Sequence, residues 1–135
     1  MGVVNVMVWI VQIMLALAFG AHGLIMLNPS MSTAASQPPG KGQRGGMTYI
    51  MAIQPSNRRI IGVLEIAAAA GLILPQLTGI LPWLTPLAAT GLVILLLAAV
   101  AFHANRGEYV NIVLNVILLL MSAFVAFMRW FVLPV

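Results

Sequence analysis

The chain has 135 residues, of which 62% are hydrophobic and only 6% are charged. A soluble domain carries roughly a quarter charged residues, so this composition excludes a water-covered globule and makes lipid the natural solvent. The net charge of +4 comes from six basic and two acidic residues, too few for a stripe of phosphate contacts, and we predict no nucleic-acid partner. The absence of cysteine excludes disulfides and thiolate metal sites.

The first predicted membrane span covers residues 3–27, which is long enough as a helix to cross about 30 Å of hydrocarbon. No lysine or arginine precedes it, so we expect a retained helix rather than a cleaved signal peptide. Pro29 predicts its end, because the residue before a proline disfavours helical geometry. The composition of residues 28–46 predicts a polar loop. Residues 47–53 are apolar but too short to span, and we expect them at the interface.

Three more apolar stretches follow, and they predict further spans at about residues 59–74, 83–103 and 110–128. Pro75 and the Thr78-Gly79 pair predict a tight connection between the second and third spans. The predicted fold class is therefore all-α, a four-transmembrane-helix bundle that forms a single integral membrane domain over the whole chain.

The basic residues predict the orientation of this bundle. Four spans place both termini and the second connection on one side, which carries only Arg129, expected as an anchor at the interface. The opposite side carries five basic residues: Lys41, Arg44, Arg58, Arg59 and Arg106. Because lysine and arginine are concentrated in cytoplasmic connections, the first and third connections are predicted to be cytoplasmic and both termini to lie outside.

Glu65 is the most informative polar residue, because it lies about five residues into the second span, roughly 8 Å deep at 1.5 Å per residue. A carboxylate there costs on the order of 2–3 kcal/mol, so Glu65 must face the bundle interior and be paired or protonated. His22, His103, Asn111 and Asn115 lie near the same boundary. These five residues are the candidate ligand-binding site; the alternative is a clasp that only packs the helices together. Both readings require the interior position.

Other chemistry has weaker support. No metal-ligating residues fall three or four apart on one helix, so we predict no metal site and assign no catalytic residues. Axial ligation of haem or a pigment by His22 or His103 is conceivable, and a quinone is a further candidate cofactor. In the half of the first span that precedes these histidines, Asn5 and Gln12 are seven residues apart and share one helix face.

Several short sequence patterns occur in an order typical of one family. They are Ala21-His22-Gly23-Leu24, Ile61-Gly62-Val63-Leu64-Glu65, Leu74-Pro75-Gln76-Leu77-Thr78-Gly79 and His103-Ala104-Asn105-Arg106-Gly107-Glu108. With them the chain resembles the DoxX-like family of small bacterial four-helix membrane proteins over everything outside residues 28–46. The resemblance implies the four-helix fold and a bacterial inner membrane. Members of the wider family are linked with thiosulfate or quinone oxidation, with membrane oxidoreductase complexes and with the chaperoning of other membrane proteins.

The chain departs from that family pattern at one position. Members often have a lysine a few residues after the first-span glycine, where this chain has Met26. Such a lysine could pair with the carboxylate of the second span. Glu65 therefore needs another partner here, and His22, His103 and the nearby arginines are the candidates.

Three functions follow as hypotheses. The first is an accessory or structural subunit of a larger membrane complex, such as one of electron transfer. Its partners are the lipid bilayer and either other membrane subunits or further copies of the chain. The second is a membrane protein linked to an oxidoreductase that binds a quinone or another lipophilic ligand. The third is a small transporter, which is disfavoured because four helices leave little room for alternating access.

Overall fold

The computed structural model describes residues 2–36 and 47–134, and over these residues the fold is all-α, as predicted. Four helices are long and apolar enough to cross a membrane. In chain order the elements are α1 (Val3–Leu27), α2 (Pro29–Ala35), the 3₁₀ helix η1 (Thr48–Ala52), α3 (Pro55–Thr78), α4 (Leu84–Asn105), α5 (Tyr109–Phe127) and the π-helical turn η2 (Met128–Val132). The basic residues Lys41 and Arg44 lie outside the described residues.

The segment predicted as a polar loop begins with a helix instead. Asn28 ends α1 and at once caps α2, because its side-chain oxygen accepts hydrogen bonds from the backbone N–H groups of Ser30 at 3.1 Å and Met31 at 3.2 Å. Pro29 occupies the first helical position, where a missing N–H group costs nothing. The Asn-Pro pair is thus a stop for one helix and a start for the next.

The helix α3 extends beyond the predicted span of residues 59–74 at both ends. Pro55 lies in its first turn, and Pro75 lies inside its last turns rather than ending the helix there. A proline inside a helix removes one backbone hydrogen bond. One turn before Pro75, the side chain of Gln12 on α1 donates to the carbonyl oxygen of Leu72 at 2.7 Å. The neighbouring helix therefore contacts the backbone of α3 close to Pro75, at a carbonyl next to the one that lacks its helical donor, and the sequence of α3 alone does not show this contact.

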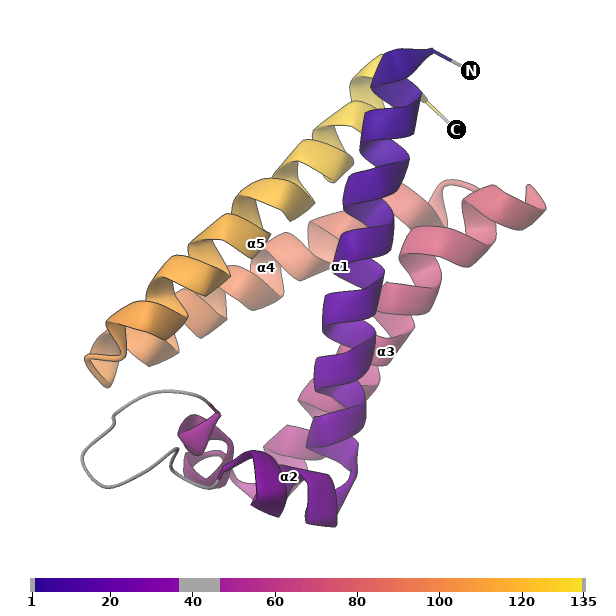
Figure 1. The fold of residues 1–135 in the computed structure, drawn as a ribbon. Coiled ribbons are helices and arrows are strands. Elements are labelled where there is room, and N and C mark those ends of the chain that lie inside the picture. Colours follow the sequence, from indigo (N-terminus) through magenta and orange to yellow (C-terminus); the bar gives the residue numbers. More distant parts are fainter. Residues whose placement is uncertain (1, 37–46, 135) are drawn as a thin grey trace.

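The four long helices pack as two pairs, α1 with α3 and α4 with α5, and α3 joins the pairs through α4. A buried apolar core unites all four: Leu15, Phe19, Leu72, Ala89, Leu92, Leu96 and Val125. Figure 1 shows the two ends of the chain close together at one end of the bundle, while α1 and α5 diverge toward the other end. Large apolar side chains cover the outside of every long helix, as a lipid-facing surface requires.

A buried cation ties α1 to the end of α5 near the termini. Arg129 is 2% exposed, and its Nε and Nη1 atoms donate to Gln12 Oε1 at 2.7 Å and to Asn5 Oδ1 at 3.0 Å. Its guanidinium also lies over the ring of Trp9. The expectation that Arg129 is an anchor at the interface is therefore wrong, because α5 continues into η2 and turns this side chain inward onto the shared face of Asn5 and Gln12.

Two glycines set the close approach of α1 and α3. A Cβ atom on Gly23 would lie 2.8 Å from the carbonyl oxygen of Gly62, and one on Gly62 would lie 3.0 Å from that of Gly23. Contact at this range between backbones requires residues without side chains, which is the usual reason for small residues in membrane helix interfaces. His22 and Glu65 flank this crossing, so it also positions the polar residues described below.

We expect Gly23→Ala to lower the free energy of unfolding by about 1–3 kcal/mol, because the added methyl group forces two backbones apart. Gly20→Ala is the matched control on the same helix, since its Cβ would meet Ala69 at an ordinary 3.8 Å. That control is expected to be neutral or slightly stabilising. Unfolding by sodium dodecyl sulfate in mixed micelles measures both; equal effects of the two variants would contradict the role of the Gly23–Gly62 contact.

Candidate functional site

A cavity of about 810 Å³ lies where the two helix pairs diverge, and η1 contributes to its lining. Its walls are mostly apolar and come from all four long helices; they include Phe19, Met26, Leu96, Phe102 and Leu118. All five predicted site residues line this one cavity: His22, Glu65, His103, Asn111 and Asn115. The structure thus brings together side chains that the sequence places on four separate helices.

Glu65 has the partner that its depth demands. The side chain is 4% exposed, and Glu65 Oε2 lies 2.7 Å from Nδ1 of His22. The prediction that this carboxyl group faces the bundle interior is confirmed. Its partner is His22, one of the two candidate histidines, in a chain that has Met26 where family members often have a lysine. Since His22 is on α1 and Glu65 on α3, this contact spans the Gly23–Gly62 crossing.

Tyr49 extends this contact into a line of three groups, and sequence analysis did not include it among the site residues. Its hydroxyl lies 2.7 Å from His22 Nε2, so carboxyl, imidazole and phenol follow one another. The 3₁₀ turn of η1 holds Tyr49 there, anchored by the fully buried Ile50. Burial raises the pKa of Tyr49, helped by the negative charges of Glu65 and Glu108, so the phenol keeps its proton.

The opposite wall has its own polar network around Glu108, at the start of α5. His103 Nδ1 lies 2.5 Å from Glu108 Oε2, and Arg106 Nε donates to Glu108 Oε1 at 2.7 Å. The Asn111 side chain donates a longer hydrogen bond, of 3.4 Å, from Nδ2 to Glu108 Oε2. Burial acts to raise the pKa of Glu108, but these three hydrogen bonds outweigh it and the pKa lies below its usual value. Glu108 therefore carries a negative charge at neutral pH and orients His103.

Tyr49 connects the two walls. Its ring packs edge-on against that of His103, with ring centroids 4.7 Å apart. His103 is 3% exposed, and its Nε2 atom has no hydrogen-bond partner in the part of the chain that the structure describes. Asn115 is less available, because its amide donates to the backbone carbonyl of Asn111 at 2.7 Å. Within the part of the chain that the structure describes, the Tyr49 hydroxyl and the His103 imidazole are therefore among the groups that keep hydrogen-bonding capacity toward the cavity, together with the side-chain oxygen of Asn111.

These contacts bear on which cofactors the residues could hold. Across residues 2–36 and 47–134, no group of three or more His, Cys, Asp or Glu side chains gathers as a metal ion would require. Both ring nitrogens of His22 are engaged, so ligation of haem iron would break its contact with Glu65 or Tyr49. His103 Nε2 and the Tyr49 oxygen face the cavity without such a conflict, since a hydrogen bond to either atom breaks none of the contacts described above.

The lowered pKa of Glu108 predicts how stability depends on pH. A carboxyl whose pKa is lower in the folded state stabilises the protein above its usual value of 4.5, and this contribution disappears as the pH falls through the folded value. We expect Glu108→Gln to lower the free energy of unfolding by about 1–2 kcal/mol at neutral pH. The difference from wild type should shrink below pH 4.5, where the wild-type carboxyl becomes protonated.

Unfolding of both proteins across acid and neutral pH checks this expectation. Arg106→Gln serves as the control, because it removes one donor to Glu108 and leaves the carboxyl and the other two donors in place. It should cost less than Glu108→Gln at neutral pH. A destabilisation by Glu108→Gln that is equally large in acid would mean that the charge of Glu108 contributes nothing.

Comparison with known proteins agrees with the motifs and the geometry. The family model of the DoxX-like family matches residues 10–125, a range that includes every residue of the polar network around the cavity. No curated protein and no solved structure matches the chain. The match covers most of the sequence and follows four apolar helices of membrane-spanning length, and the protein accordingly belongs to the DoxX-like family as an integral membrane protein.

Proposed function

We propose that this protein binds a lipophilic small molecule with an oxygen-bearing polar head, such as a quinone, in the cavity between the two helix pairs. The observation that carries the proposal is the cavity itself, about 810 Å³ with mostly apolar walls and a polar cluster. Pockets for small organic ligands have roughly 300–1,000 Å³ and the same combination of apolar lining and few polar groups. A ring and part of an apolar tail fit this volume.

The polar groups support an oxygen-bearing head. The Tyr49 hydroxyl and the His103 imidazole line the cavity with hydrogen-bonding capacity to spare, and the side chain of Asn111 lies beside them. A carbonyl or hydroxyl oxygen between these groups would replace the water that they otherwise need. Phe19, on the apolar wall, suits an aromatic or quinonoid ring.

A clasp between helices is the competing interpretation of the same residues, and the cavity argues against it. A clasp requires only the contact of His22 with Glu65, and it would be stabilised by close packing around that pair. Instead, the pair lines a large cavity, and Tyr49 extends the line of polar groups along it. The contacts therefore serve the packing of α1 on α3 and remain available to a ligand.

The proposal is tested by filling the cavity without touching its polar groups. Ala99 lines the cavity, whereas Ala101, two residues later on α4, is exposed outside it. We expect Ala99→Phe to weaken the binding of a short-chain ubiquinone by about tenfold or more, and Ala101→Phe to leave it unchanged. Glu65→Gln should also weaken binding, because Glu65 holds His22 and thereby Tyr49.

Equilibrium binding to protein in lipid nanodiscs gives these affinities. Negligible binding by the wild type, equal to that of Glu65→Gln, would remove a quinone as the ligand. Equal affinity of the wild type and Ala99→Phe would show that a quinone binds elsewhere. In either case the clasp would be the better account of the His22–Glu65 contact.

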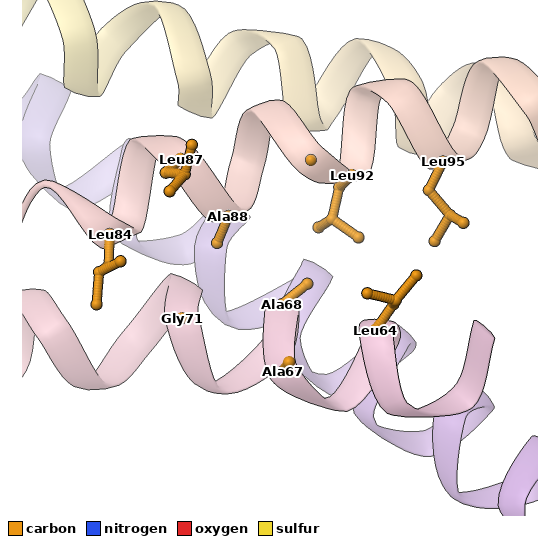
Figure 2. A pocket seen from close by; sticks show the side chains of 10 residues that line it. Leu64, Ala67, Ala68, Gly71, Leu84, Leu87, Ala88, Leu92 and Leu95 are labelled. Atoms are coloured by element: carbon orange, nitrogen blue, oxygen red, sulfur yellow. The ribbon is translucent and has the colours of Figure 1, made fainter. Parts of the chain in front are cut away.

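A second candidate function is that of an accessory subunit in a larger membrane complex. A shallow apolar groove of about 330 Å³ runs between α3 and α4 on the outer surface, and Figure 2 shows the small residues Ala67, Gly71 and Ala88 along it. Small residues allow a helix of another chain to approach closely in lipid. This groove favours an assembly role, which is compatible with ligand binding in the separate cavity lined by His22 and Glu65.

Sizing in mild detergent tests this role. We expect the wild type to elute as an oligomer or with another polypeptide in fixed proportion, and Gly91→Leu to elute as a monomer. Gly91 lines the groove and is exposed, and a Cβ atom there would meet nothing within 4 Å, so a side chain can start at this position without a clash; circular dichroism checks that the variant is folded. A wild-type protein that is a stable monomer without a companion would count against the subunit role.

The orientation is also a proposal. We infer that the protein lies in a bacterial inner membrane with both termini outside and the polar end of the cavity toward the cytoplasm. Arg58 and Arg106 support this, since they bond to Met51 of η1 and to Glu108, at the end where the cavity residues lie. Basic residues collect on the cytoplasmic side of membrane proteins.

A further inference from the structure

The line of Glu65, His22 and Tyr49 restricts where protons can be placed. Both contacts of the imidazole are 2.7 Å long, so each of its nitrogen atoms either donates or accepts one hydrogen bond. A carboxylate can only accept, a neutral imidazole donates through one nitrogen and accepts through the other, and a phenol can do both. The direction of each hydrogen bond is therefore set by the number of protons on the His22–Glu65 pair.

Consider first the pair with one proton. Glu65 is then a carboxylate, so His22 Nδ1 donates to it and Nε2 carries no hydrogen. The Tyr49 hydroxyl must donate to Nε2 to make their 2.7 Å contact. Its proton is thereby used, and only the lone pairs of its oxygen remain available to the cavity. In this state Tyr49 can accept a hydrogen bond from a ligand but cannot donate one.

A second proton on the pair reverses this arrangement. Whether His22 becomes an imidazolium or Glu65 becomes a carboxylic acid that donates to Nδ1, Nε2 now carries a hydrogen. Nε2 therefore donates to the Tyr49 oxygen, and the phenolic proton is free to turn away from His22. In this state Tyr49 donates a hydrogen bond into the cavity that it lines.

We propose that Tyr49 contacts the head oxygen of the ligand and that the proton count of the His22–Glu65 pair selects the chemical class of that oxygen. This inference rests on the proposed ligand-binding function. With one proton on the pair the site takes a hydroxyl, which donates to Tyr49. With two protons it takes a carbonyl, which accepts from Tyr49. Tyr49 is the contact residue, and His22 and Glu65 are positioning residues that act through it.

The other charged groups around Tyr49 do not set the hydrogen-bond direction of its hydroxyl; the His22–Glu65 pair does. His103 of α4 contacts Tyr49 through an edge-on packing of the two rings, without a hydrogen bond to the Tyr49 hydroxyl. Glu108 at the start of α5 affects Tyr49 through its negative charge and not through a hydrogen bond. Both are already joined to each other, and Arg106 neutralises Glu108. His22 is the only titratable group hydrogen-bonded to the Tyr49 hydroxyl among the residues that the structure describes.

Linkage then predicts proton exchange with the ligand. A carbonyl ligand binds best to the pair with two protons, so its binding takes up as much as one proton per site once the unliganded pair has lost one. Where binding takes up a proton, its affinity should fall with rising pH, by at most about tenfold per pH unit. A hydroxyl ligand favours the pair with one proton, so its affinity should not fall with rising pH.

The first test needs no ligand. The chain has two tyrosines, and Tyr109 is 79% exposed, so Tyr109→Phe leaves Tyr49 as the only tyrosine without disturbing the fold. The tyrosine doublet in ultraviolet resonance Raman spectra distinguishes a phenol that donates from one that accepts. As the pH falls, we expect the doublet to change from the pattern of a donating phenol to that of an accepting phenol. Circular dichroism at each pH checks that the protein is still folded. An unchanged doublet would overturn the inference, because the phenol keeps its proton throughout.

The second test uses a short-chain ubiquinone and its quinol, kept reduced under anaerobic conditions, as carbonyl and hydroxyl probes. Calorimetry in two buffers of different ionisation enthalpy counts the protons taken up on binding. We expect uptake with the quinone by the wild type and none with Tyr49→Phe, which should also lose the opposite pH dependence of the two probes. The same proton uptake in both proteins would refute the role of Tyr49. If neither probe binds the wild type, the proposed function fails for this ligand class, while the Raman result still decides on Tyr49.

Discussion

The contact of His22 with Glu65 joins α1 to α3 at a depth where a carboxyl group has no water to satisfy it. Taking such a group out of water is costly unless it is paired, so the two helices must cross where these residues can meet. Gly23 and Gly62 lie beside them and allow the two backbones to touch. The polar contact and the small-residue crossing depend on each other, because a wider crossing would separate His22 from Glu65.

The other end of the bundle is tied by different chemistry, and the contrast explains where the cavity lies. Near the termini, Arg129 is buried with neutral amide partners from α1, Asn5 and Gln12, which hold α5 against α1. At the opposite end α1 and α5 diverge, and η1 lies between the helix pairs with Tyr49 between His22 and His103. The cavity of about 810 Å³ therefore lies at the end of the bundle where the helix pairs are spread apart (Figure 1).

The sequence predicted those features that lipid imposes on each helix separately. The apolar stretches predicted four spans, and the structure has four helices long and apolar enough to cross a membrane. The cost of a buried charge predicted that Glu65 faces inward, and its side chain is buried. The sequence analysis did not include Tyr49 in the site and did not predict the inward direction of Arg129, because both positions depend on tertiary contacts. Tyr49 reaches His22 from a short turn 27 residues later, and Arg129 reaches Gln12 across 117 residues. Periodicity and hydropathy contain no information about such pairings.

The distribution of hydrogen-bonding capacity separates a packing clasp from a binding site. A polar network that only fastens helices is most stable when every donor and acceptor within it is satisfied. Here Glu65 Oε2 and both nitrogen atoms of His22 are engaged, whereas the Tyr49 hydroxyl and the His103 imidazole keep capacity toward the same cavity. Two such groups on facing walls of an apolar cavity need a partner that is polar at one point and apolar elsewhere. A lipophilic molecule with an oxygen head combines these two properties, which is why we propose this class of ligand for the cavity.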